Sequence, residues 1–128
     1  MVVVKRAYEP YAASDGYRVL VDRLWPRGLS KAKAHLDVWE KDIAPSDRLR
    51  LWYEHDPAKW PDFQKRFKRE LSAPVAKSVL DKLARRAKSG RVTLVYSSRA
   101  GDISNAAVLA RLLNQRVKRA RASNPSTI

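Results

Sequence analysis

The sequence has no cysteine among its 128 residues. This absence excludes disulfide bonds, cysteine-ligated metal sites and thiol catalysis, and it is typical of proteins from the reducing cytosol. Only two histidines are present, His35 and His55, too few for a histidine-rich metal site. No segment approaches the roughly 20 apolar residues of a membrane span, and the Met-Val-Val-Val-Lys-Arg start lacks the apolar core of a signal peptide. We therefore expect a cytoplasmic protein without a membrane partner. We assign no metal site, although the chain retains carboxylates that can bind a metal, and the sequence identifies no cofactor.

Acidic residues are scarce in the second half of the chain. Residues 65–128 hold 16 basic and 3 acidic side chains, whereas residues 1–64 hold 11 and 10, and the whole chain carries a net charge of +14. A basic surface attracts polyanions such as nucleic acid, acidic proteins or anionic lipid. The same charge can also serve solubility alone, with no specific partner. The sequence leaves both interpretations open.

The length and the hydrophobic pattern predict a single α/β domain over residues 1–119, followed by a flexible basic and polar tail at 120–128. Strands are predicted at 2–6, 17–24 and 91–96, with a further extended segment at 36–41. Helices are predicted as one turn at 31–35, then from Ser46, from Asp56-Pro57 to about Leu71, from Pro74 to Gly90, and from Ser104. We expect the strands to form one small mixed or parallel sheet with helices on both faces, which gives three layers.

A polar cluster follows the second predicted strand. It reads Asp22-Arg23-Leu24-Trp25-Pro26-Arg27-Gly28, with Lys31 shortly after. Ligands of open α/β sheets bind at the carboxyl ends of the strands. Arginines there can hold phosphate or carboxylate through paired hydrogen bonds, and an indole can stack on a ring. The structural alternative is that Asp22 pairs with an arginine, Trp25 belongs to the core and the Pro-Arg-Gly segment is only a turn.

A second cluster lies between the last predicted strand and the last helix. Its candidate anion-binding residues are Ser97, Ser98, Arg99 and Ser104, beside the free N–H groups of a helix N-terminus. The loop lacks a Gly-Lys-Ser/Thr ending, so it is no Walker loop, and a single glycine makes no dinucleotide fingerprint. An ordinary capped loop is the alternative. Because both clusters follow strands expected to be parallel neighbours, we predict that they meet and place Arg23 or Arg27 near the start of the last helix.

Catalytic candidates are few. His55, between two predicted helices, has the side chain for general acid–base chemistry, although a loop histidine bonded to the backbone is a common structural outcome. Asp22 and Asp102 are the remaining weak candidates. No Ser-His-Asp order, His-Glu-x-x-His motif or carboxylate pair stands out, so the sequence discloses no reaction.

Long segments of the chain resemble a known family. They are Val4–Glu9, Asp15–Lys31, Trp39 with Lys41–Ser46, Leu49-Arg50 with Trp52, and His55–Pro57 with Trp60 and Phe63. Over residues 3–113 the chain resembles the family called domain of unknown function 488, in its small single-domain YeaO-like group. The resemblance implies a cytoplasmic prokaryotic α/β protein whose activity is not established. It also implies that the polar positions of the family motifs matter here: Asp22, Arg23, Trp25, Pro26, Arg27, Gly28, Lys31, Lys41, Pro45, Ser46 and His55.

One loop departs from the family pattern. Many members carry an aspartate early in the loop after the last strand and Asn-His-Ala where the helix begins, whereas this chain has Ala100 and Ser104-Asn105-Ala106. Either a family acid–base function is lost, or Asp102 supplies the acid from a shifted position. Backbone N–H groups would still allow an anion to bind.

Three functions remain open from the sequence. The first is binding of a phosphate-containing or other anionic small molecule at the carboxyl ends of the strands, through the arginine- and tryptophan-rich site. The second is nucleic-acid binding by the basic second half of the chain, as in a regulatory protein. The third is interaction with an acidic protein. The oligomeric state does not follow from the sequence.

Overall fold

The computed structural model describes residues 1–122 and contains one four-stranded parallel sheet. Its strands are β1 (Val2–Arg6), β2 (Tyr17–Leu20), β3 (Val38–Trp39) and β4 (Val92–Tyr96). They lie in the order β1-β4-β2-β3 and all pairs are parallel. Every residue of β4 is buried, as expected for the central strand of a sheet that is covered on both faces. The predicted α/β class and the predicted pairing of the second strand with the last are confirmed.

Five α-helices accompany the sheet in the described part of the chain: α1 (Lys31–Ala34), α2 (Asp47–Tyr53), α3 (Trp60–Glu70), α4 (Pro74–Ser89) and α5 (Asn105–Ala122). Short 3-10 turns occupy Ala13–Asp15, Lys41–Ile43, Pro57–Lys59 and Gly101–Ile103. The predicted serine caps are present: the hydroxyls of Ser30, Ser46 and Ser104 accept backbone N–H groups at the starts of α1, α2 and α5. None of the described helices is long and apolar enough to cross a membrane.

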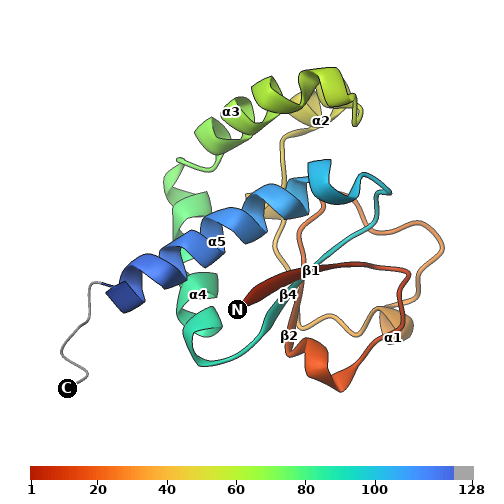
Figure 1. The fold of residues 1–128 in the computed structure, drawn as a ribbon. Coiled ribbons are helices and arrows are strands. Elements are labelled where there is room, and N and C mark those ends of the chain that lie inside the picture. Colours follow the sequence, from red (N-terminus) through yellow and green to blue (C-terminus); the bar gives the residue numbers. More distant parts are fainter. Residues whose placement is uncertain (123–128) are drawn as a thin grey trace.

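The two faces of the sheet are covered unequally. Helices α4 and α5 lie on one side of the strands, with α3 and α2 beyond them, and α1 lies on the other side (Figure 1). Along β2 and β4 the side chains alternate: Val19 and Leu94 join the large core under the helices, whereas Leu20 and Val95 join a small cluster with Trp25 and Trp39. The second face of the sheet is therefore covered mainly by loop residues and by the indole rings of Trp25 and Trp39, rather than by helices.

Three predicted boundaries need correction. Strand β2 ends at Leu20 rather than at residue 24, because the chain turns out of the sheet and the Asp22 carboxylate bonds the loop after β4. Helix α4 ends before Gly90, but this glycine is extended, at φ −176°, and not left-handed. Helix α5 continues to Ala122, so residues 120–122 are helical where a flexible tail was expected. The rest of the expected tail, 123–128, lies outside the described residues.

Candidate anion-binding site

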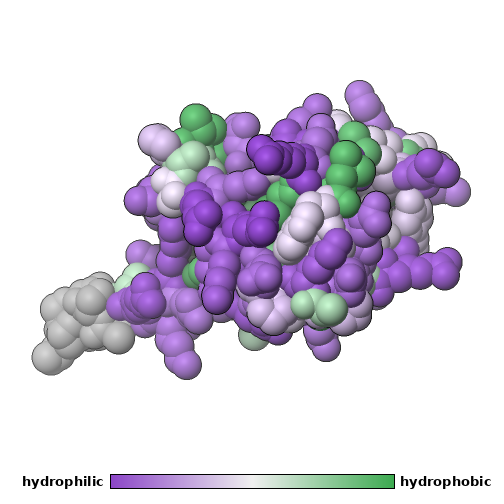
Figure 2. All heavy atoms as spheres, turned by 90° about the horizontal axis from the view of Figure 1, so that it is seen from above, coloured by the Kyte–Doolittle hydropathy of each residue, from purple (hydrophilic) through white to green (hydrophobic). Residues whose placement is uncertain are grey.

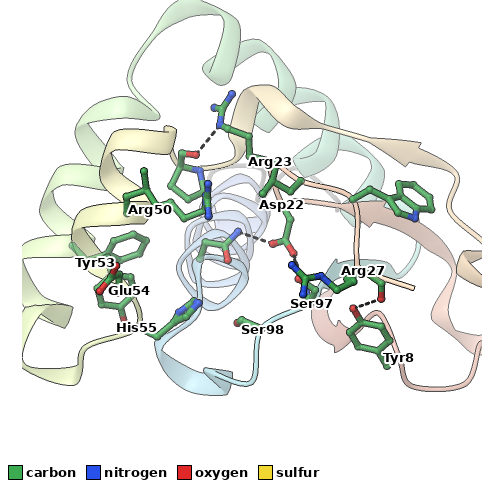
Figure 3. A pocket seen from close by; sticks show the side chains of 16 residues that line it. Tyr8, Asp22, Arg23, Arg27, Arg50, Tyr53, Glu54, His55, Ser97 and Ser98 are labelled. Atoms are coloured by element: carbon green, nitrogen blue, oxygen red, sulfur yellow. Dashed lines mark hydrogen bonds between the residues drawn. The ribbon is translucent and has the colours of Figure 1, made fainter. Parts of the chain in front are cut away.

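A pocket of about 580 Å³ lies where the chain leaves the carboxyl ends of the strands. Its wall is built by the segments that follow β1, β2 and β4, by α2 and the turn after it, and by the first residue of α5 (Figure 3). The lining residues are Tyr8, Asp22, Arg23, Leu24, Trp25, Arg27, Pro45, Arg50, Leu51, Tyr53, Glu54, His55, Phe63, Ser97, Ser98 and Asn105.

The structure brings together most of the residues that the sequence singled out. Those that line the pocket are Asp22, Arg23, Trp25, Arg27, His55, Ser97 and Ser98. Those that do not are Lys31, Arg99, Asp102 and Ser104. Lys31, Arg99 and Asp102 are exposed elsewhere, and Ser104 is fully buried as the cap of α5. Neither Asp102 nor Ala100, the position of the family aspartate, lines this pocket.

Asp22 joins the two polar loops. Its Oδ2 accepts hydrogen bonds from the Ser97 backbone N–H at 2.8 Å and from the Ser97 hydroxyl at 2.9 Å. Its Oδ1 accepts a bond from the Asn105 amide at 3.3 Å, and the same amide donates to the Val21 carbonyl at 3.0 Å. The loops after β2 and β4 thus meet, as their parallel strands predicted. Among the described residues Asp22 has no ion pair with an arginine, and its oxygens hold the site together.

The two arginines after β2 have different roles. Arg23 donates from Nε to the Pro45 carbonyl at 3.0 Å and from an Nη to the Ala44 carbonyl at 3.4 Å, so it fastens its loop to the segment before α2. Arg27 is exposed, and only its backbone carbonyl is engaged, by the Tyr8 hydroxyl at 2.9 Å. Within the described part of the chain, the Arg27 guanidinium has no hydrogen-bond partner. The Arg27 guanidinium is therefore free to bind a ligand, whereas hydrogen bonds to the Pro45 and Ala44 carbonyls hold the Arg23 guanidinium.

Trp25 forms part of the wall and is only partly buried. Its indole N–H donates to the Leu29 carbonyl at 2.6 Å, and its ring meets Trp39 edge-on at 5.5 Å between centroids. Trp39 in turn donates to the Asp22 carbonyl at 2.6 Å. The pair of indoles supports the loop from the second face of the sheet, so the orientation of Trp25 at the pocket is fixed.

Helix α2 contributes residues that the sequence did not single out as site residues. Arg50 and Tyr53 share one helix face because they are spaced i and i+3, and Glu54 follows as the cap residue of the helix. Arg50 bonds Asp47 at 3.3 Å, and its buried Nε has no hydrogen-bond partner among the described residues. This spacing was the available signal, but the placement of α2 beside the strand ends depends on tertiary packing.

Tyr53 links α2 to the segment before α5. Its hydroxyl donates to the Ile103 carbonyl at 2.7 Å and its ring stacks on Phe63 at 4.0 Å. Burial, with a smaller effect of the Asp56 charge, raises the pKa of Tyr53 to about 12. The phenol is therefore a neutral donor at physiological pH, and it acts in positioning rather than as a proton carrier.

His55 stands at the pocket in an unusual backbone conformation. Both Glu54 and His55 are left-handed, at φ 46° and 57°, although neither is glycine. The imidazole meets the Tyr53 ring edge-on at 5.6 Å and is exposed. The left-handed turn directs the chain back from α2 and leaves His55 at the rim (Figure 3).

Comparison with known proteins identifies the family. The family model described as "Inactive DUF488-N3 subclade" matches residues 1–128. The uncharacterized protein Rv3073c of Mycobacterium tuberculosis (strain ATCC 25618 / H37Rv) is 45% identical over 115 residues, covering 90% of this chain and 95% of the relative. The uncharacterized protein YeaO of Escherichia coli (strain K12) is 41% identical over 106 residues, covering 83% and 90%. No solved structure matches. With a match over its full length and relatives of this identity, the chain belongs to the inactive DUF488-N3 subclade of the DUF488 proteins.

Proposed function

We propose that this protein binds a phosphate-containing or other anionic small molecule in the pocket at the carboxyl ends of β2 and β4. The observation that carries the proposal is that three arginines from two separate segments, Arg23, Arg27 and Arg50, line one cavity. Guanidinium groups form the strongest protein hydrogen bonds with phosphate and carboxylate, because the fork of donors matches two oxygens.

Two carboxylates also line the cavity, and they do not cancel this preference. Asp22 is engaged by Ser97 and Asn105 through hydrogen bonds on both oxygens. Glu54 is exposed at the rim, where water screens its charge. By contrast, the Arg27 guanidinium is exposed and has no hydrogen-bond partner among the described residues.

Binding is favoured over catalysis for this chain. By the family resemblance, Ala100 stands where many members carry an aspartate. Asp102 does not line the pocket, and the matching family is described as inactive. A pocket lined by three arginines, next to a loop without the family aspartate, fits a ligand-binding role.

The test compares melting temperatures with and without excess inorganic phosphate. We expect phosphate to raise the Tm of the wild type, because a ligand that binds only the folded state stabilises it. Arg27→Ala should keep the wild-type Tm without ligand, since its side chain has no partner to lose, and should lose most of the phosphate shift.

Arg48→Ala is the matched control. Arg48 is exposed on α2 outside the pocket, so this variant loses the same charge and should keep the full shift. Equal shifts in the Arg27 and Arg48 variants would mean that phosphate binds elsewhere. No shift in the wild type would reject the site for phosphate.

Nucleic-acid binding is the second candidate. Lys65, Lys68 and Arg69 are exposed on α3, and further basic side chains are exposed on α4 and α5. In residues 65–122, Arg116 with Asp81 is the one described ion pair, so most of these charges are not neutralised within the chain. The space-filling view shows a mainly hydrophilic face with separate small apolar patches (Figure 2). Polyanion binding to such a surface would weaken steeply with salt, unlike binding in a pocket of arginines.

A further inference from the structure

The pocket is much larger than an inorganic anion needs. Its volume of about 580 Å³ falls within the roughly 300–1,000 Å³ typical of pockets for whole organic ligands. The cationic side chains account for only part of the wall, and an apolar part is formed by Trp25, Pro45 and Phe63 together with two leucines. The occupant should therefore have an apolar part in addition to its anionic group.

Two of the most exposed large apolar residues of the protein belong to this wall. Leu24, in the loop after β2, is 58% exposed, and Leu51, on α2, is 59% exposed. Neither is needed to fill the core. Exposed leucines gathered at a pocket are typical of a ligand contact, because they lose unfavourable hydration when a ligand covers them.

Tyr8 adds a ring to the same region. It is 46% exposed, and its hydroxyl is held by the Arg27 carbonyl at 2.9 Å, so the phenol is anchored beside the arginine. In Figure 3 its ring lies next to Arg27 at the pocket. An anchored, exposed aromatic ring beside a cation favours a ligand with a flat ring close to its anionic group, because flat rings stack with good contact.

We infer that the occupant is a phosphate monoester with a planar ring, of which a nucleoside monophosphate is the representative, with its phosphate at Arg27 and Arg50 and its ring against Tyr8, Leu24 and Leu51. This inference rests on the proposed anion-binding function and adds the chemical class of the ligand body. A straight alkyl phosphate has the same charge but could not stack on the phenol.

The experiment measures Kd by calorimetry for AMP, ribose 5-phosphate, octyl phosphate and adenosine. We expect AMP to bind about 10-fold more tightly than ribose 5-phosphate, since covering a leucine and a ring is typically worth one order of magnitude. Leu51→Ser should reduce this ratio several-fold and leave the Kd of ribose 5-phosphate unchanged.

Val75→Ser is the matched control, because Val75 is 60% exposed on α4 and does not line the pocket. It should preserve the AMP preference. Equal affinities for AMP and ribose 5-phosphate, or a preference for octyl phosphate over AMP, would overturn the planar-ring inference and leave anion binding intact. Adenosine binding as tightly as AMP, or no binding by any phosphate ester, would overturn the proposed function itself.

Discussion

At the scale of single residues, the pocket contains backbone strain. His55 is left-handed at φ 57°, a conformation that costs a residue with a Cβ about 1–2 kcal/mol and costs glycine almost nothing. His35 has the same conformation, at φ 48°, but lies outside the pocket. The two histidines therefore allow strain and ligand binding to be separated.

We expect His55→Gly to raise the free energy of unfolding by up to about 1 kcal/mol and to reduce the phosphate-induced Tm shift. His35→Gly is the control: it removes the same kind of strain and should keep the full phosphate shift. Urea unfolding gives the stabilities, and melts with phosphate give the shifts. A His55→Gly protein that keeps the whole shift would show that the imidazole does not serve the site.

Asp15 is the second residue whose effect can be measured. It is 7% exposed and accepts bonds from Lys5 Nζ at 3.0 Å and from Arg18 Nη1 at 2.6 Å. Burial raises the pKa of Asp15, but hydrogen bonds from the Ala12 amide, Lys5 and Arg18 outweigh it and hold this pKa below its usual value. The ionised carboxylate therefore stabilises the fold above the unfolded-state pKa of about 3.9, and this contribution is lost as the pH falls through the lower folded-state pKa.

We expect Asp15→Asn to lower the free energy of unfolding by about 3 kcal/mol at pH 7, because Arg18 would remain buried without its charge partner. The difference from wild type should shrink as the pH falls below about 4. Urea titrations at pH 7 and pH 3 measure both effects, with the exposed Asp42→Asn as control. A difference that does not depend on pH would contradict the assigned role of the carboxylate.

At the scale of elements, runs of apolar residues were the feature of the sequence that best predicted the strands. The strands 2–6 and 91–96 were predictable almost to the residue, because both contain runs rich in β-branched residues, which favour strands. Serine residues at cap positions and proline residues in first turns predicted where the helices begin. The left-handed ends of α1 and α2 were not predictable, since His35 and Glu54 carry no local signal for this conformation.

The candidate site was predictable where it depended on strand order and not where it depended on helix packing. Residues after β2 and β4 were found because the carboxyl ends of parallel neighbours must meet. Arg50 and Tyr53 were missed because nothing local fixes α2 over those ends. Lys31 was included because of its nearness in sequence, but α1 lies on the other side of the sheet (Figure 1).

The edge strand β1 is protected by side chains. Asn114 of α5 accepts from the Val2 N–H at 2.9 Å and donates to the Val2 carbonyl at 2.8 Å. Glu9 accepts from the Arg6 N–H at 2.6 Å. These bonds occupy backbone groups that would otherwise be open to another strand, a known hazard of sheet edges.

We expect Asn114→Ala to lower the free energy of unfolding by about 1–2 kcal/mol and to increase self-association, because two backbone groups lose their partner. Size-exclusion chromatography over a range of concentrations measures the association. Gln115→Ala, at the next and exposed position of α5, should behave as wild type. A variant that remains as monodisperse as the Gln115 control would show that the amide is not what protects the edge.

At the scale of the whole molecule, charge and pocket are separate features. The basic residues of α3 and α4 lie on helices that cover the large core, whereas the arginines of the pocket belong to the strand ends and α2. Nucleic-acid binding and small-anion binding can therefore be tested independently on the same protein.

We expect single-stranded RNA to bind at low salt and to be largely released at a few hundred millimolar salt, with log Kd linear in log salt. Lys65→Gln with Lys68→Gln should lower the slope by about 2 if both contact phosphates. Lys31→Gln with Lys33→Gln removes the same charge from α1 and should leave the slope nearly unchanged. Equal slopes in the two double variants would indicate only a general effect of net charge.

The position of Trp25 has a practical consequence for every binding experiment on this chain. Of the four tryptophans of the sequence, Trp25 lies in the wall of the described pocket, and Trp39, Trp52 and Trp60 do not. Indole emission responds to the polarity and the quenchers around the ring, and hydrogen bonding to Leu29 holds this ring in place. The unmodified protein thus contains a fluorescent reporter in the pocket wall, whereas Trp60 on α3 and Trp52, with Arg66 over its ring at 4.3 Å, report on the basic helices.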